Sequence, residues 1–392
     1  MNITDIEVAI VREARATARG DARLGGVTDN RQQAALVTVR TDAGLAGYGE
    51  ANANPAAIKA LIESEYTLPG GWDDGIKDLL IGEDPSDPRA LWTKLAGATF
   101  WSCKTGLGHV ALAGIDMALW DLAGKIRGVP VWQLLGDRRN LELRPYVTLY
   151  HGSSGFDDTV RRMLDTIDRI VEEGYQAAKV EALEDNTADN REAVRLVERV
   201  REHVGDDFTL LLDVGYRWES FEEARDCARE LDAFGLAFLE TPFPPENVEA
   251  YRRLSEHIET PLAGADILTA YCDYLHLLDS DAVEVFQAGA CRTGISDMDH
   301  LARAAAGRGR QFVPWGWCAT AFTTAANLHL SVVHDNVPLI EYAPPSIYSE
   351  AVLRARLAGP EPRVSHGLFE TPSEPGLGIG LDENALATFR AE

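Results

Sequence analysis

The sequence predicts an α/β protein whose main part is a barrel of parallel strands. Short apolar segments recur from residue 143 onward, and most of them are separated by amphipathic helical stretches. Acidic residues stand at the ends of three successive segments. Strands that alternate with helices are typical of a parallel α/β barrel. A doubly wound open sheet is the alternative, but no GxGxxG motif follows any early strand.

The N-terminal part has a different pattern and predicts a separate α+β unit. Strand-like alternation covers "ITDIEVAIV" and "AALVTVRTDAGLAGYGEA", and a helical region then runs from "NPAAIKALIE" to "GVPVWQLLG". We expect this unit over residues 1–135 and the barrel over 140–355. The rest, 356–392, is a Gly- and Pro-rich tail that we expect to fold back on the N-terminal unit.

Eight segments are predicted as barrel strands. The helix after the first of them carries Val160, Met163 and Ile167 at helical spacing and ends at Gly174, a C-cap candidate. The segments are "LRPYVTLY" (143–150), "AAKVEA" (177–182), "TLLLDVG" (209–215), "LAFLETP" (236–242), "TPLAGAD" (260–266), "AVEVFQAG" (282–289), "QFVPWG" (311–316) and "VPLIEYAPP" (337–345).

Composition and charge exclude several classes of protein. A net charge of −25 argues against nucleic-acid binding, which requires a basic surface. No apolar stretch approaches the roughly 18 residues of a membrane span, and the N-terminus lacks the pattern of a signal peptide, so we expect a cytoplasmic protein. The five cysteines are scattered without CxxC spacing, which suggests neither a disulfide framework nor a zinc site.

The acidic residues Asp213, Glu240 and Asp266 follow three successive predicted strands at intervals of 27 and 26 residues. Singly, each has an ordinary explanation, since Asp before Gly forms turns and Glu before Thr-Pro can begin a helix. Together, they would converge at the carboxyl end of a barrel and repel one another. Three oxygen ligands suit Mg²⁺, so the spacing predicts a magnesium site.

Lys179 and Glu181 lie two residues apart in "AAKVEA" and would point to the same face of a strand. The pair could supply a catalytic base, with desolvation lowering the pKa of Lys179 and Glu181 opposing that shift. Glu181 could itself be the base or an additional metal ligand. A solvated ion pair at a strand end is the third interpretation.

Several motifs resemble the enolase superfamily, in its mandelate racemase and muconate lactonizing enzyme branch. They are "GLAGYGEA" (44–51), "GEDPSDPRALW" (82–92), "AGIDMALWDLAGKIRGVPVWQLLG" (113–136) and "PGLGIGLD" (375–382). The resemblance covers nearly the whole chain. It implies a modified (β/α)₇β TIM barrel beneath an α+β capping domain that is built from the N-terminal part and the C-terminal tail.

The resemblance also implies a reaction. Members of this family abstract the proton α to a carboxylate, and Mg²⁺ stabilises the resulting enediolate. Asp213, Glu240 and Asp266 match the metal-ligand positions, although Glu is more usual at the third. Glu341 matches a glutamate of the eighth strand that contacts substrate in some members, and a strand-end salt bridge is its alternative explanation. A homo-oligomer is expected by analogy alone.

Other positions depart from the family pattern. The second lysine of a K-x-K motif is replaced by Glu181, and the "VPH" of the seventh strand reads "VPW" with Trp315. Judged from the landmark "RTGIS", the base position of the sixth strand is Ala288. Neither opposing base is therefore present, which disfavours a two-base racemisation.

Three further residues are candidates for proton transfer or substrate binding. They are His151 just past the first strand, Tyr146, and Trp315, which could stack on a sugar face; structural hydrogen bonding or core packing are the alternatives.

We therefore expect a dehydratase that converts a sugar acid, a small carboxylate, to a 2-keto-3-deoxy acid. The alternatives are an epimerase, racemase or cycloisomerase, or a barrel that binds Mg²⁺ and an anion but has lost catalysis.

Overall fold

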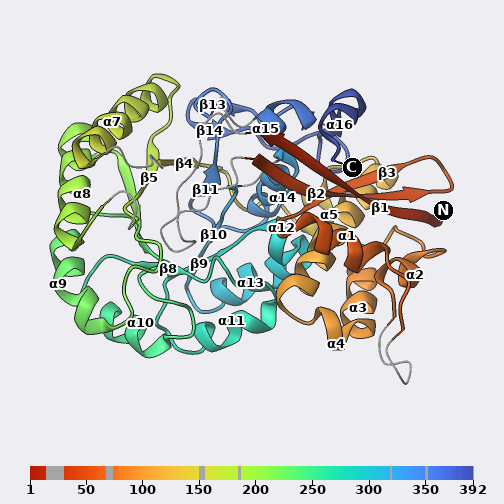
Figure 1. Cartoon of the computed structure of the whole chain (residues 1–392), viewed down its shortest axis with the longest axis horizontal. Helices are drawn as coiled ribbons and strands as arrows, with labels where there is room; N and C mark the ends of the chain where they lie inside the picture. The colour runs from red at the N-terminus through yellow and green to blue at the C-terminus, as the bar shows by residue number, and fades with distance from the viewer. Residues whose placement is uncertain are drawn as a thin grey trace.

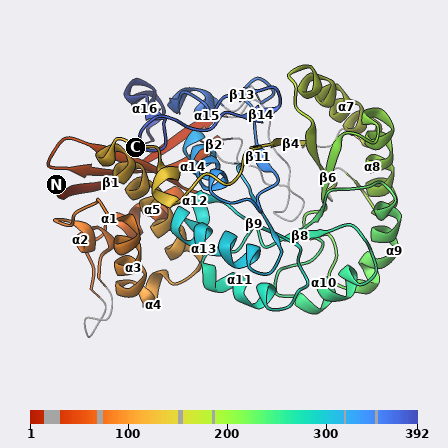
Figure 2. The ribbon, with the colours of Figure 1, turned by 180° about the vertical axis from the view of Figure 1, so that it is seen from behind.

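The computed structural model describes residues 1–14, 31–67, 74–149, 155–183, 187–317, 320–348 and 352–391. A barrel and an α+β unit lie side by side, as Figure 1 shows from the front and Figure 2 from behind. Within these ranges, no helix combines the length and the apolar character that crossing a membrane requires.

The predicted α/β barrel is confirmed. Its eight strands form one sheet in the order β10-β9-β8-β7-β6-β5-β4-β11, in which every pair is parallel. The last strand thus returns to the first, which nearly closes the ring. The strands are β4 (Pro145–Leu149), β5 (Ala177–Glu181), β6 (Thr209–Asp213), β7 (Leu239–Glu240), β8 (Leu262–Gly264), β9 (Val285–Ala288), β10 (Gln311–Pro314) and β11 (Ile340–Tyr342).

Helices cover the outside of this barrel (Figure 1). Their apolar faces are buried against the strands, as with Val160, Met163 and Ile167 of α7, where helical spacing predicted a buried stripe. The helices are α7 (Phe156–Glu172), α8 (Asn190–Val204), α9 (Phe221–Asp232), α10 (Val248–Ser255), α11 (Tyr271–Leu278), α12 (Ala290–Thr293), α13 (Ile295–Ala306) and α14 (Ala321–Val332).

The N-terminal unit is an antiparallel sheet backed by helices, with its own apolar core. The central helix α5 (Gly106–Arg127) is buried along most of its length. The other elements are β1 (Ile3–Ala14), β2 (Arg31–Thr41), β3 (Ala46–Ala51), α1 (Pro55–Glu63), α2 (Ile76–Leu80), α3 (Pro88–Ala98), α4 (Phe100–Cys103) and α6 (Val131–Leu135).

The "GLAGYGEA" motif owes its glycines to the close approach of β3 to α5. A Cβ atom on Gly47 would lie 2.0 Å from the carbonyl oxygen of Ala118, and one on Gly49 would lie 2.1 Å from that of Gly114. Both distances are shorter than any non-bonded contact, so only glycine lets the strand lie on the helix.

The C-terminal tail lies against the N-terminal unit, and both termini lie at the same end of the molecule (Figure 1). Arg390 bridges to Val11 of β1, and the Ala391 amide donates to the Ile10 carbonyl at 2.8 Å. The tail elements are α15 (Val352–Leu357), β12 (Ala358–Gly359), β13 (Val364–Ser365), β14 (Leu368–Phe369), β15 (Gly380–Leu381) and α16 (Glu383–Phe389).

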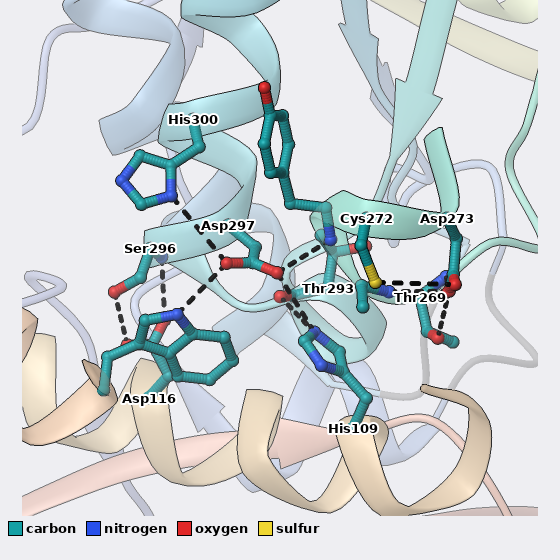
Figure 3. Close-up of polar contacts among 12 residues, drawn as sticks. His109, Asp116, Thr269, Cys272, Asp273, Thr293, Ser296, Asp297 and His300 are labelled. Carbon is teal, nitrogen blue, oxygen red and sulfur yellow. Dashed lines mark hydrogen bonds and ion pairs between the residues drawn. The ribbon is translucent and has the colours of Figure 1, made fainter. Parts of the chain in front are cut away.

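Polar contacts join the N-terminal unit to the barrel around α13 (Figure 3). Asp297 accepts hydrogen bonds from the indole N–H of Trp92 at 3.1 Å and from the backbone of Tyr271 at 2.8 Å. Close by, both carboxylate oxygens of Asp116 accept from Ser296, at 2.8 Å and 2.7 Å. These buried contacts fix the position of the unit on the barrel.

Candidate active site

Alternation along the strands decides which side chains face the inside of the barrel. Residues paired in register on neighbouring parallel strands share a face. Glu181 pairs with Asp213, and Asp213 pairs with Glu240, so all three share the interior face with Lys179. A buried apolar layer lies beneath them, formed by Tyr146, Ala177, Leu211, Phe238, Ala263, Val285, Val313 and Leu339.

The three predicted metal ligands stand at successive strand ends. Asp213 is the last residue of β6, Glu240 is the last of β7, and Asp266 follows β8 by two residues. Asp213 accepts hydrogen bonds from the Thr241 hydroxyl at 2.6 Å and from the Gly215 amide at 2.8 Å. The Tyr216 hydroxyl donates to Asp266. These bonds orient two of the three carboxylates.

The backbone is strained beside each of these carboxylates. Tyr216, Thr241 and Ala265 have φ angles of 59°, 50° and 73°, in the left-handed region that disfavours residues with a side chain. Thr241 directly follows Glu240, and Ala265 directly precedes Asp266. Such strain is concentrated at functional sites, where surrounding contacts hold it in place.

Lys179 lies buried among carboxylates at the centre of this layer. Its Nζ donates to both oxygens of Glu240, at 2.8 Å and 2.9 Å. It also lies 3.4 Å from Glu341 and 3.9 Å from Asp213. The site is therefore an acidic cluster around one ammonium group.

The structure corrects the expected pKa of Lys179. Burial alone does act to lower it, as the sequence suggested. However, the negative charges of Glu240 and Glu341 outweigh burial and hold the Lys179 pKa well above its usual value. The residues that oppose desolvation are thus on β7 and β11, whereas the sequence had assigned that effect to Glu181, which is itself buried on the same strand.

Burial has the opposite effect on the pKa of a carboxylate, which it raises. Burial raises the pKa of Asp266, and it raises that of Glu240 even though Lys179 acts to lower it. Glu341 differs, because Lys179 and the Thr148 hydroxyl overcome burial and hold its pKa below the usual value. The cluster thus gathers more acidic groups than its one ammonium can neutralise.

The chemistry of the three predicted ligands fits Mg²⁺, because all three supply carboxylate oxygens and they come from neighbouring strands. As placed, however, no three His, Cys, Asp or Glu side chains among the described residues are grouped closely enough to hold a metal ion. Glu240 is turned to Lys179, Asp213 to Thr241, and Asp266 to Tyr216. Metal binding would require these side chains to reorient.

Glu341 lies beside the ammonium as part of the same cluster. Its carboxylate also accepts from the Gly316 amide at 2.8 Å, and this bond connects β11 to the second residue after the end of β10. The salt bridge considered for Glu341 therefore exists, with Lys179 as its partner.

The remaining substrate candidates differ in their positions. Tyr146 lies in the apolar layer, its ring is 5.7 Å from the Lys179 Nζ, and burial raises its pKa well above the usual value. Trp315 follows β10 and is partly buried, with its ring packed against Gly289. His151 lies outside the described residues.

The sequence analysis did not consider Gln287; it placed the base position of the sixth strand at the neighbouring Ala288 and concluded that this base is absent. Ala288 packs in the core between the strands and the outer helices. Gln287 pairs in register with Val313 of the inner layer and so faces the interior. The strict alternation of Val285 and Gln287 with Phe286 and Ala288 was the signal that could have identified it.

Comparison with known proteins shows similarity over both parts of the chain. The family model described as "Enolase C-terminal domain-like" matches residues 162–385. The model "Mandelate racemase / muconate lactonizing enzyme, N-terminal domain" matches residues 5–136. D-galactarolactone cycloisomerase from Agrobacterium fabrum is 30% identical over 92% of this chain and 92% of its own.

Two further proteins are similar over nearly the whole chain. Arabinonate dehydratase from Saccharolobus solfataricus is 26% identical over 94% of this chain and 93% of its own. The crystal structure of a racemase from Streptomyces coelicolor A3(2) with bound magnesium superposes with a TM-score of 0.82. It is 21% identical and is covered over 100% of its chain and 99% of this one, which shows the shared fold.

Proposed function

Because the chain belongs to the mandelate racemase and muconate lactonizing enzyme family of the enolase superfamily, we propose that it dehydrates a sugar acid to a 2-keto-3-deoxy acid. The observation that carries the proposal is the buried Lys179 ammonium within a cluster of carboxylates at the carboxyl ends of the strands. Active sites of α/β barrels are built at that end.

Asp213, Glu240 and Asp266 would hold the metal ion. Bound there, Mg²⁺ offsets the negative charge that develops on the substrate carboxylate when the α-proton leaves. The negative charge of these carboxylates repels a further anion unless a cation accompanies it. The site therefore selects a carboxylate substrate together with its metal.

Lys179 is the residue that we propose to move the proton. Glu240 and Glu341 hold the pKa of Lys179 well above its usual value, so its amine could act as a base only once Glu240 is turned from it to the metal ion. The neutral amine would then take the α-proton, and the electrons of the C–H bond form a double bond between C1 and C2. The resulting ammonium gives a proton to the β-hydroxyl, and as the C–O bond breaks and water departs, those electrons shift to C2=C3 and the carboxylate is restored. The enol then takes up a proton at C3 and loses the proton of its C2 hydroxyl, which gives the 2-keto acid. Glu181, on the same face of β5, is the alternative acceptor.

A cycloisomerase is the second candidate function. It is favoured by the relative with 30% identity, which is a D-galactarolactone cycloisomerase. Both reactions begin with removal of the proton α to a carboxylate, so the same residues would serve. The two differ in the product, since cycloisomerisation conserves the mass of the substrate and dehydration removes one water.

The proposal is tested with a panel of aldonic and aldaric acids, including D-galactonate, D-mannonate, D-arabinonate and galactarate, and with sugar-acid lactones. Each is incubated with the protein and Mg²⁺, and products are identified by mass spectrometry and NMR. We expect a 2-keto-3-deoxy acid from at least one open-chain acid. Turnover of lactones alone, without loss of water, would replace dehydration by cycloisomerisation.

A further inference from the structure

Gln287 is a buried polar residue whose side-chain hydrogen bonds are not supplied by the part of the protein that the structure describes. Its side chain is fully buried on the interior face of β9. Neither its amide oxygen nor its amide nitrogen has a hydrogen-bond partner among the described residues. Buried amides are nearly always paired, because an unpaired one loses its bonds to water without compensation. The unpaired amide of Gln287 therefore points to a ligand.

Trp315 presents a second unpaired donor next to the same strand end. Its indole Nε1 is buried and also lacks a partner within the described part of the chain. A Cβ atom on Gly289, two residues after Gln287, would lie 2.7 Å from the indole ring. The ring thus fills the space that a side chain at position 289 would occupy. The Trp315 carbonyl accepts from Asn327 at 2.7 Å, which anchors its backbone.

Gln287 lies across the barrel from Lys179, and Trp315 follows the neighbouring strand β10. In the ring of eight strands, β5 and β9 are separated by three strands in either direction. The ammonium lies on β5, and the carboxylates lie on β5, β6, β7 and β11 and just past β8, so Asp266 and Glu341 flank the segment formed by β9 and the end of β10. The side formed by β9 and the end of β10 presents an amide and an indole, neither of which is ionisable under ordinary conditions.

We propose that Gln287 and Trp315 form an uncharged wall that binds the hydroxyl groups of the substrate's carbon chain. An amide oxygen can accept from one hydroxyl while the amide nitrogen donates to its neighbour, which suits a vicinal diol. The indole Nε1 donates to another oxygen, and its ring can cover the C–H face of the chain. The inference rests on the proposed function and specifies its substrate as a polyhydroxylated acid.

The wall also determines which substrates are rejected. A second carboxylate placed against an amide and an indole would lose its hydration without gaining a counter-charge. Neutral polyol chains avoid that cost. Monocarboxylic aldonic acids should therefore bind better than the aldaric acids of the same length.

The experiment compares Gln287→Leu with a matched control, Gln176→Leu. Gln176 is exposed at the other end of the barrel, so the control makes the same chemical change away from the wall. Binding of D-galactonate, D-mannonate, D-arabinonate and galactarate to the Mg²⁺-loaded proteins is measured by calorimetry, alongside Mg²⁺ affinity and melting temperature. Product formation is measured in parallel.

We expect Gln287→Leu to weaken binding of the aldonic acids at least tenfold, to leave Mg²⁺ affinity unchanged, and to raise the melting temperature. The last effect follows because an unpaired buried amide is replaced by an apolar group of similar size. Gln176→Leu should change none of the three. If Gln287 had only a structural role, its replacement by Leu would instead lower the melting temperature.

Three results would overturn the wall: unchanged acid affinity in Gln287→Leu, a loss of Mg²⁺ affinity, or failure of every acid to bind the wild-type protein. A different result separates the two proposals. Acids that bind in a Gln287-dependent way but yield no keto acid would refute the proposed dehydration and support the wall.

Discussion

Replacing Lys179 by Met should destabilise the metal-free protein strongly. Methionine has a similar length but no charge, so the change removes the ammonium and little volume. The Lys179 Nζ lies 2.8 Å and 2.9 Å from the Glu240 oxygens and 3.4 Å from Glu341, and all three side chains are buried. Breaking a buried ion pair from one side costs about 3–5 kcal/mol, because the remaining charge is left uncompensated.

Mg²⁺ should recover much of this loss. A divalent ion supplies the positive charge that Lys179→Met lacks, and a ligand at 100 times its Kd stabilises the folded state by about 2.7 kcal/mol. The variant should also bind Mg²⁺ more tightly than the wild-type protein, since no ammonium competes for Glu240. The assay is urea unfolding with EDTA or with Mg²⁺, together with Mg²⁺ titration.

Lys94→Met provides the control. Lys94 pairs with Glu83 at 2.6 Å, but both side chains are about two-fifths exposed. Exposed pairs contribute about 0–1 kcal/mol, so this variant should unfold nearly as the wild type does. A stabilising buried ion pair at Lys179 would be ruled out if Lys179→Met in EDTA lost no more stability than Lys94→Met, or if Mg²⁺ stabilised both variants equally.

Two further predictions concern the fold. Burial acts to raise the pKa of Asp299, but His334 and Arg303 hold it at about 2. Because this pKa is below that of the unfolded chain, the ionised carboxylate stabilises the folded protein above pH 4. That stabilisation is lost as the pH falls from about 4 to 2. Asp299→Asn should therefore cost about 2 kcal/mol at pH 7 and flatten the acid limb of a pH–stability curve; an unchanged curve would contradict this. Gly49→Ala should destabilise by at least about 1–3 kcal/mol, because its Cβ would lie 2.1 Å from the Gly114 carbonyl. Gly97→Ala, with nothing within 4 Å, should be neutral or stabilising in thermal melts; equal losses would disprove the packing argument.

The sequence was sufficient to predict the barrel and the positions of its acidic residues at the strand ends. Strands and helices that alternate with clear periodicity leave little freedom in topology, and Asp213, Glu240 and Asp266 each fall at or just past a strand end. The proposed metal role of these residues remains a prediction.

The sequence was not sufficient to predict which residues contact Lys179. Its nearest neighbour Glu240 is 61 residues away and comes within reach only when the barrel closes. Gln287 was missed for a different reason. The landmark "RTGIS" assigns a position in the family pattern, but it does not show which residues of the strand face the interior, and neighbouring residues of a strand face opposite sides.

We propose that Lys179 exchanges the proton α to the carboxylate of a sugar acid. The most direct test is NMR of a bound aldonic acid in D₂O with Mg²⁺, which follows deuterium entering at C2 even without net turnover. Wild-type protein and Gln176→Leu should incorporate deuterium, whereas Lys179→Met should not while still binding Mg²⁺. Undiminished exchange in Lys179→Met would contradict the claim and leave Glu181 as the base.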